Sequence, residues 1–329
     1  MFIQTVRQIF PNSIIVDAAL KYPITPQGWD VEMPGRSECR FNEPDFKLVL
    51  NLQDMLTMGP DGIPNELTRI HSFYKPWADM DKIIVVVWPL RLADEYDGEF
   101  HLVEFSTHQY ETWQSYKNGE EVLREAFDKK HKDFQYNFLC MNRISKPHRK
   151  ILYSKLMSLS RGNISLQTHG HELKYPGLDY KTYNNTYDNL SNLLSLKQNF
   201  NTSMFSIISE SQYEERWGII SEKTFNAIVA GHPFLVAGHQ SCLDDIKSFG
   251  FKTWDCMFDE EYQYAQNTHR IDAMLESNGN YLTLIKPQLL QGLVDYHQSV
   301  IDYNRDYFFN RFGPDRLAYF RAQLLNIWE

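Results

Sequence analysis

The stretch SIISESQYEERWGIISEKTFNAIVAGHPFLVAG (206–238) decides the fold class of this chain. The apolar run at 203–211 and the run PFLVAG (233–238) are typical of strands. Between them, residues 221–231 repeat apolar side chains at helical spacing, and Gly231 is a typical helix stop. A strand, a helix and a second strand in this order predict two parallel strands with the helix packed on one face.

The same alternation continues towards the N-terminus and occurs in two series. Before residue 133, we predict strands at 13–19, 46–52, 82–88 and 101–105, with helices at 66–77 and 119–131. From residue 134, we predict further strands at 134–141, 164–168 and 251–255, and further helices at 148–159, 186–196 and 242–251. The run KIIVVVW (82–88) lacks polar alternation, which indicates a strand buried on both faces.

The charged segment DKKHKD (128–133) separates the two series and indicates a domain boundary. We therefore expect two Rossmann-like α/β domains, at residues 1–132 and 133–256, followed by C-terminal helices at 257–329. A chain of 329 residues has the length of two ordinary domains.

Composition and charge exclude several classes of protein. With 43% hydrophobic and 23% charged residues, the chain is globular rather than disordered or fibrous. Its formal net charge of -9 argues against a general nucleic-acid coat, although a local basic groove stays open. The aromatic content of 14% predicts either well-filled cores or a platform on which sugars or bases stack.

The cysteines and the N-terminal segment bear on the cellular compartment. None of the four cysteines forms a CxxC pair, which excludes a zinc ribbon and a thioredoxin-type motif and fits a reducing, cytoplasmic compartment. The first residues lack the basic, apolar and cleavage regions of a signal peptide. No run approaches 18 apolar residues, so we expect no membrane span.

Ligands of open parallel sheets bind beyond the carboxyl ends of the strands, and one such end is strongly basic. Asn142 and Arg143 follow the strand at 134–141, and Lys146 and Arg149 continue this loop into a helix. Helix N-termini and cationic side chains both attract anions. A solvated basic helix start is the alternative interpretation.

Two more segments belong to the same predicted edge. Glu210 stands at the end of the second strand, where a carboxylate can bind ribose hydroxyls or act as a surface cap. Ser221 suits an N-cap, and Glu222 suits the positive end of the helix dipole. Lys223 opposes that dipole, as a phosphate-binding lysine would, with a solvated lysine as the alternative. Together the three segments predict a site for a nucleoside diphosphate.

The stretch 206–238 resembles the donor-binding segment of α1,3-fucosyltransferase-like glycosyltransferases of the viral and bacterial type. In that family an ENS-type strand end precedes a TEK helix start, a small-residue helix and a PxxxG strand. Here these places are taken by Ser209-Glu210-Ser211, by Ser221-Glu222-Lys223 and by the run from Pro233 to Gly238. The segments 138–152 and 243–263 are also similar, so the resemblance covers about residues 134–263.

This resemblance implies a GT-B fold, in which two Rossmann-like domains face each other across a cleft and the second binds the nucleotide sugar. By position, Glu222 would hold the ribose, Lys223 with Arg143 or Arg149 the diphosphate, and Glu210 a sugar or ribose hydroxyl. Asn142 and Ser221 complete the implied donor-binding set. Because the ENS element is altered here, the role of Glu210, the donor base and the donor sugar stay open.

Glycosyl transfer needs a base for the acceptor hydroxyl and stabilisation of the leaving diphosphate. By resemblance, cations and helix dipoles stabilise the diphosphate, so we expect no metal and no cofactor beyond a nucleotide sugar such as a GDP- or UDP-sugar. The DxD-like run Asp79-Met80-Asp81 precedes a strand instead of following one, which indicates a helix end or turn. Candidate bases at strand ends of the first domain are Glu104, then Asp54, then His108.

These observations predict a hexosyl- or fucosyl-type glycosyltransferase, metal-independent and inverting. Its acceptor would be a glycan or, as in phage-type DNA modification, a hydroxymethylated DNA base flipped into the site. DNA could bind to DKKHK (128–132) and to the series Arg305, Arg311, Arg316 and Arg321. The alternative interpretation of the arginine series is a solvated helix face. The rival from another class is a catalytically inactive nucleotide-binding or scaffold protein of the same fold. A Rossmann dehydrogenase is excluded because no GxGxxG follows a strand.

Overall fold

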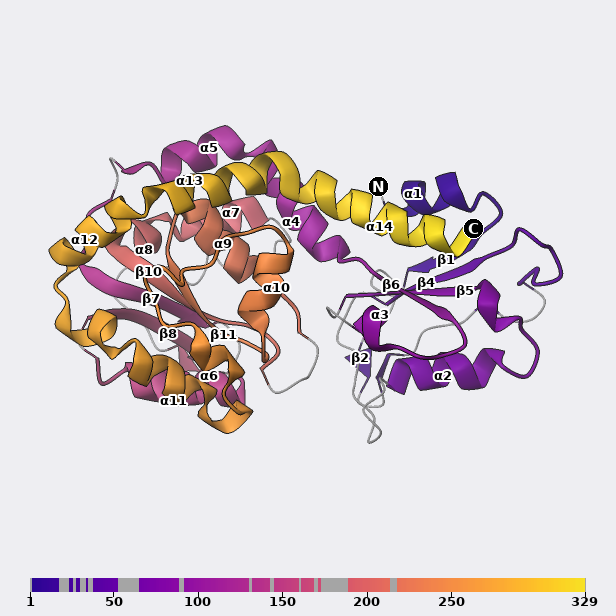
Figure 1. Cartoon of the computed structure of the whole chain (residues 1–329), viewed down its shortest axis with the longest axis horizontal. Helices are drawn as coiled ribbons and strands as arrows, with labels where there is room; N and C mark the ends of the chain where they lie inside the picture. The colour runs from indigo at the N-terminus through magenta and orange to yellow at the C-terminus, as the bar shows by residue number, and fades with distance from the viewer. Residues whose placement is uncertain are drawn as a thin grey trace. The chain divides into compact units, whose positions relative to one another are not determined.

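The chain forms two compact units, one of residues 1–108 with 315–329 and one of residues 109–314. They are described from a computed structural model, drawn in Figure 1. It describes residues 2–17, 24–25, 28–29, 34, 38–52, 65–88, 92–129, 132–142, 145–159, 161–168, 171–172, 189–213 and 218–328. Each unit contains its own sheet of mainly parallel strands, which confirms the α/β class.

The first unit is built on a parallel sheet of order β1-β4-β5-β6. Its strands are β1 (Ile14–Asp17), β4 (Leu48–Leu52), β5 (Ile83–Val87) and β6 (His101–Glu104). Every residue of β4 and β5 is buried, which confirms the prediction for the run at 82–88. The small pair β2 (Ile24–Thr25) and β3 (Gly28–Trp29) is antiparallel.

Helices of the first unit come from both ends of the chain. They are α1 (Phe2–Ile9), α2 (Asn65–Tyr74), the 3-10 turn η2 (Met80–Lys82), α3 (Leu92–Glu95) and most of α14 (Gly313–Trp328). The ring of Phe320 on α14 stacks on Phe105 and Phe2, with centroid distances of 4.5 Å and 5.5 Å. The end of the predicted helical tail therefore belongs to the core of the first unit.

The second unit is built on a sheet of order β11-β10-β7-β8-β9, in which only β9 is antiparallel. Its strands are β7 (Tyr136–Asn142), β8 (Gly162–Thr168), β9 (His171–Glu172), β10 (Ser203–Ser209) and β11 (Phe234–Ala237). The helix α9 (Glu222–Ala230) connects β10 to β11 and ends at Gly231, whose φ of 66° favours glycine. The strand, helix and strand predicted from 206–238 are confirmed.

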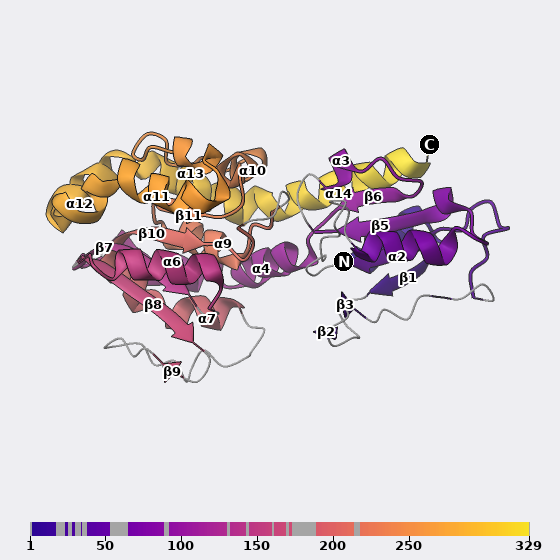
Figure 2. The same ribbon diagram turned by 90° about the horizontal axis from the view of Figure 1, so that it is seen from below.

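The helices of the second unit lie on both faces of this sheet (Figures 1 and 2). They are α4 (Thr107–Asn118), α5 (Glu120–Ala126), α6 (Pro147–Leu156), α7 (Asn189–Ser195), α8 (Lys197–Thr202), α10 (Cys242–Ser248), α11 (Asn267–Ser277), α12 (Pro287–Tyr296) and α13 (Gln298–Tyr307). The 3-10 turn η4 (Glu261–Tyr264) and the π-helical turns η5 (Asn280–Leu284) and η6 (Phe308–Phe312) complete the unit. A helical C-terminal region is thereby confirmed.

The strand predicted at 251–255 is wrong, because side chains take the backbone groups that a neighbouring strand would have bonded. The Asn304 amide bonds both the N–H and the carbonyl of Lys252, each at 2.8 Å. The Glu260 carboxylate accepts from the Trp254 N–H at 2.7 Å and from the Thr253 hydroxyl at 2.8 Å.

The division between the units falls at residues 108 and 314, whereas the sequence led us to expect boundaries at 132 and 256. Residues 109–132 join the second unit because α4 packs against α9. The Tyr116 hydroxyl donates to Asn226 Oδ1 at 2.5 Å, and the Gln109 amide donates to the Ile220 carbonyl at 2.7 Å. The predicted tasks of the two parts, acceptor binding and nucleotide-sugar binding, stay predictions.

Much of the aromatic content fills the core of the second unit. Phe225 of α9 packs against both Phe308 and Phe312, with centroid distances of 5.6 Å and 5.0 Å, and Phe251 lies 5.3 Å from Phe312. These rings explain part of the high aromatic count without any ligand. In the described part of the chain, no helix combines the length and apolar character needed to cross a membrane.

A lysine at the C-terminal end of α9 leads to a prediction about stability. Lys132 Nζ donates to the Ala230 carbonyl at 3.0 Å. Burial, with a smaller effect of Arg305, lowers the pKa of Lys132 from 10.5 to about 7. Between these two values the unfolded chain binds more protons than the folded protein, so this lysine makes stability rise with pH, by at most about 1.4 kcal/mol per pH unit.

We expect Lys132→Met to remove this rise, as measured by urea unfolding from about pH 7 to about pH 10. The exposed Lys150 gives the control, because Lys150→Met should leave the pH dependence as it is in the wild type. Equal slopes in the wild type and in Lys132→Met would contradict the prediction.

Candidate functional site

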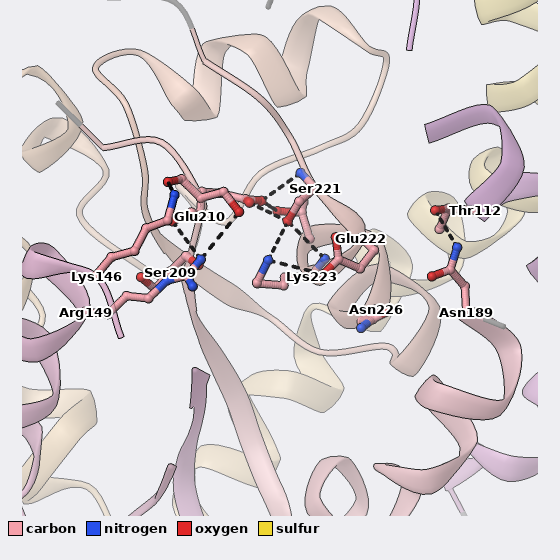
Figure 3. A network of polar contacts seen from close by, with 12 residues as sticks. Thr112, Lys146, Arg149, Asn189, Ser209, Glu210, Ser221, Glu222, Lys223 and Asn226 are labelled. Atoms are coloured by element: carbon pink, nitrogen blue, oxygen red, sulfur yellow. Dashed lines mark hydrogen bonds and ion pairs between the residues drawn. The ribbon is translucent and has the colours of Figure 1, made fainter. Parts of the chain in front are cut away.

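Three segments meet at the carboxyl edge of the second sheet, around the start of α9 (Figure 3). They are the start of α6 with Lys146 and Arg149, the residues after β10 from Glu210 onward, and the start of α9 with Ser221. Strand order predicts that these segments share one edge, and in the structure their side chains contact one another or the neighbouring backbone.

Glu210 is the centre of the contacts and is fully buried. Its Oε1 accepts from the Ser221 N–H at 3.1 Å and from the Thr224 hydroxyl at 2.7 Å. Its Oε2 accepts from the Ser221 hydroxyl at 2.5 Å. A carboxylate that accepts three hydrogen bonds at the N-terminus of a helix anchors that helix. Glu210 thus has a structural task, and its predicted contact with a donor hydroxyl stays a prediction.

The start of α9 keeps two charged side chains within reach of solvent. Ser221 is the N-cap, as predicted, and its Oγ accepts from the Lys223 N–H at 3.4 Å. The Nζ of Lys223 lies 3.1 Å from Ser221 Oγ and 3.2 Å from Glu222 Oε1. The side chains of Lys223 and Glu222 are 21% and 30% exposed, so a ligand could reach either one.

The basic loop contributes two cations that bind the end of β10. Arg149 is 2% exposed and donates through Nη2 to the carbonyls of Ser209 and Glu210 at 3.3 Å and 3.2 Å. Burial lowers the pKa of Arg149, and the nearby carboxylates of Glu210 and Glu222 oppose this shift. The Nζ of Lys146 donates to the Ser211 carbonyl at 2.7 Å. The alternative of a purely solvated helix start does not hold for Arg149.

A group of buried polar atoms at this edge makes no hydrogen bond within the described part of the chain. They are Asn142 Oδ1, Ser145 Oγ, Ser209 Oγ, Gln212 Oε1 and His239 Nδ1. All five come from the ends of β7, β10 and β11 or from the residues that follow them. Because unsatisfied buried polar atoms are costly, each of these five indicates a place for water or a ligand.

His239 also lies at this edge and is not among the predicted site residues. It follows the predicted strand 233–238 directly, and the strand-end criterion applied to β7 and β10 would have found it. The ring is 2% exposed, and its Nε2 lies 2.6 Å from Asp245 Oδ2. Asp245, itself 3% exposed, comes from the first turn of α10.

The candidate bases of the first unit have different surroundings. Glu104 ends β6, and its Oε1 lies 2.5 Å from Arg316 Nη2 of α14, with both side chains largely buried. The amide of Gln323 bonds both the N–H and the carbonyl of Glu104, at 2.9 Å and 3.0 Å. The ring of His108 lies 5.4 Å from that of Trp88. Asp54 lies outside the described residues, as does Arg143 of the donor set.

The DxD-like run lies in the 3-10 turn before β5, at the end of the strand where the sequence placed it. Asp81 Oδ1 lies 2.9 Å from His101 Nε2. Among the side chains that the structure describes, no three of His, Cys, Asp or Glu gather in a way that could hold a metal ion.

Comparison with known proteins found no matching family model and no matching curated protein. Solved structures of the wall teichoic acid polymerase TagF are weakly similar. Two variants share 12% identity with TM-scores of 0.24 and 0.23, and the matches cover 89% and 79% of this chain and 74% and 70% of theirs. A TagF structure soaked with CDPG shares 12% identity with a TM-score of 0.26, covering 89% of this chain and 73% of that one.

These TM-scores are too low to establish a shared fold, so neither the GT-B arrangement nor an activity is taken from TagF. The resemblance of 206–238 to the fucosyltransferase-like family therefore stays a prediction.

The role of Glu210 as an anchor can be tested by changing its charge alone. We expect Glu210→Gln to lower the free energy of unfolding by about 2–4 kcal/mol, because an amide cannot replace a buried carboxylate that accepts three hydrogen bonds. Urea unfolding measures this loss. The matched control, Glu222→Gln, removes a partly exposed ion pair and should cost less than about 1 kcal/mol. Equal losses in the two variants would contradict the anchoring role.

Proposed function

We propose that this protein is a glycosyltransferase that moves a sugar from a nucleoside-diphosphate donor to an acceptor hydroxyl, without a metal and with inversion. The observation that carries the proposal is the carboxyl edge of the second sheet. Cations, a helix N-terminus and unsatisfied buried polar atoms gather there, where open parallel sheets bind nucleotides. The resemblance of 206–238 to fucosyltransferase-like enzymes supports the same donor class.

The diphosphate is the part of the donor that fits the start of α9. Among the described residues of the three segments, Lys146, Arg149 and Lys223 bring three positive charges against the two carboxylates of Glu210 and Glu222. The helix N-terminus adds its dipole to that excess. Lys223 is the cation best placed to follow the charge that develops on the leaving diphosphate, because its side chain is partly exposed. In other enzymes, losing one such donor costs roughly 3 kcal/mol of transition-state stabilisation.

The hydroxyl groups of the donor fit the remaining polar atoms. Asn142 Oδ1 and Ser209 Oγ are buried hydrogen-bond acceptors without a partner in the described part of the chain. A hydroxyl of the nucleotide sugar can donate a hydrogen bond to each. The partly exposed carboxylate of Glu222 is the proposed ribose ligand. Glu210 acts in this proposal as a positioning residue that fixes α9.

The acceptor that we propose is a glycan, with hydroxymethylated DNA as the alternative. Of the arginines that could have lined a DNA groove, Arg316 is paired with Glu104, and Nε and Nη2 of Arg305 are buried. Only Arg311 and Arg321 of that series are exposed, and the chain carries a net charge of -9. Neither observation favours a polyanionic acceptor.

The general base stays among the predicted candidates. Glu104 would have to leave its ion pair with Arg316 before it could meet an acceptor hydroxyl, since Arg316 holds the carboxylate in place. The ring of His108 lies beside that of Trp88. Asp54 lies outside the described residues. An inverting mechanism requires that one group of this kind meet the acceptor hydroxyl.

Calorimetric titration with GDP-, UDP-, dTDP- and CMP-linked sugars tests the donor site. We expect one donor base to bind selectively, with the same affinity in EDTA. Lys223→Ala should weaken this binding at least about tenfold, because it removes a charge-assisted contact to phosphate. Lys150→Ala removes an exposed lysine from α6 and serves as the control that should bind as the wild type does.

Failure of the wild type to bind any of these nucleotides would sink the donor-site proposal. Selective binding without transfer of sugar to any glycan, or to hydroxymethylated DNA, would favour the inactive nucleotide-binding protein instead. Loss of binding in EDTA would exclude the metal-independent mechanism.

A further inference from the structure

The histidines of the second sheet differ in one respect that points to a ligand. His232, at the amino edge, has both ring nitrogens engaged: Nδ1 lies 3.1 Å from Ser206 Oγ and Nε2 lies 2.6 Å from the Phe200 carbonyl. His239, at the carboxyl edge, is equally buried but has only Nε2 engaged, with Asp245. Its Nδ1 is buried without a hydrogen-bond partner among the described residues.

The partner of Nε2 determines what Nδ1 can do. An ionised carboxylate only accepts hydrogen bonds, so the 2.6 Å contact with Asp245 Oδ2 requires a proton on Nε2. In the neutral ring Nδ1 then carries a lone pair and accepts a hydrogen bond. A protonated ring would leave a buried Nδ1–H without an acceptor, which is unfavourable.

The position of His239 places this acceptor at the candidate donor site. Ala237 of β11 pairs with Ser209 of β10, so His239 and Glu210 follow neighbouring strands by two residues and one residue. The ring also lies against Gly218, three residues before the N-cap of α9. A Cβ atom added to Gly218 would lie 1.7 Å from Nδ1 and 1.8 Å from Cε1, so the backbone of Gly218 packs directly on the ring and no side chain would fit there.

We propose that His239 is a donor-binding residue whose Nδ1 accepts a hydrogen bond from a hydroxyl of the nucleotide sugar, and that Asp245 is the positioning residue that fixes its tautomer. This inference rests on the proposed function and adds His239 to the residues that are predicted to bind the nucleotide sugar. A hydroxyl, and not a phosphate oxygen, is the matching group, because a phosphate oxygen at neutral pH only accepts hydrogen bonds. The hydroxyl belongs to the ribose or to the transferred sugar.

Two substitutions separate Nδ1 from Nε2 by geometry. A glutamine side chain reaches the position of Nε2 and can keep the contact with Asp245, but it has no atom at the position of Nδ1. His239→Gln should therefore fold and keep the Asp245 hydrogen bond while it loses the ligand contact. His232→Gln makes the same change at the opposite edge of the sheet, where no contact with the nucleotide sugar is proposed. It is the matched control.

Calorimetry with nucleoside diphosphates and with nucleotide sugars measures the effect. We expect His239→Gln to weaken binding about 5- to 10-fold, the loss typical of one neutral hydrogen bond, and His232→Gln to bind as the wild type does. Equal weakening for a diphosphate and its sugar conjugate assigns the contact to the ribose. Weakening of the conjugate alone assigns it to the sugar.

Nitrogen-15 NMR of the imidazole gives a second readout that a merely structural histidine would not change. The free protein should show a proton on Nε2 and a bare Nδ1, and the Nδ1 resonance should move when the nucleotide sugar is added. A proton on Nδ1 in the free protein would overturn the inference, as would unchanged affinity in a folded His239→Gln. The latter result would assign Nδ1 to a buried water. A wild type that binds no nucleotide would overturn the proposed function and this inference together.

Discussion

The candidate site depends on a buried carboxylate at the start of a helix. Glu210 accepts from the Ser221 N–H, the Ser221 hydroxyl and the Thr224 hydroxyl, and it is fully buried. These bonds fix α9 to the end of β10, while Arg149 holds the Glu210 carbonyl from the side of α6. A buried carboxylate is tolerated only when it is satisfied in this way. The placement of Lys223 and Glu222 at the start of α9 follows from that anchor.

The elements around this anchor could be predicted because local pattern and tertiary structure agree there. The strands β10 and β11 are short apolar runs, and α9 has an N-cap serine and a C-terminal glycine. The segment 251–255 has the same apolar appearance but forms no strand, since Asn304 and Glu260 bond its backbone. Contacts with residues far along the chain decide such a case, and no local pattern reports them.

For the site, too, the sequence predicts some features and not others. Strand order was enough to bring Arg149, Glu210 and Lys223 to one edge, because carboxyl ends of parallel strands share an edge. It could not show that the Glu210 carboxylate accepts its hydrogen bonds from Ser221 and Thr224, because strand order says nothing about such side-chain contacts. Nor could it pair His239 with Asp245, although both are close in sequence, because a single αL residue, Ser241, turns the chain between them.

A structure of the protein with its nucleotide-sugar donor tests the central claim most directly, namely that the carboxyl edge of the second sheet is the donor site. The account predicts the diphosphate at the N-terminus of α9, within hydrogen-bonding distance of Lys223, with a donor hydroxyl on Nδ1 of His239. Density for the nucleotide at another edge or on the first unit, with α9 and its lysine unliganded, would contradict the account.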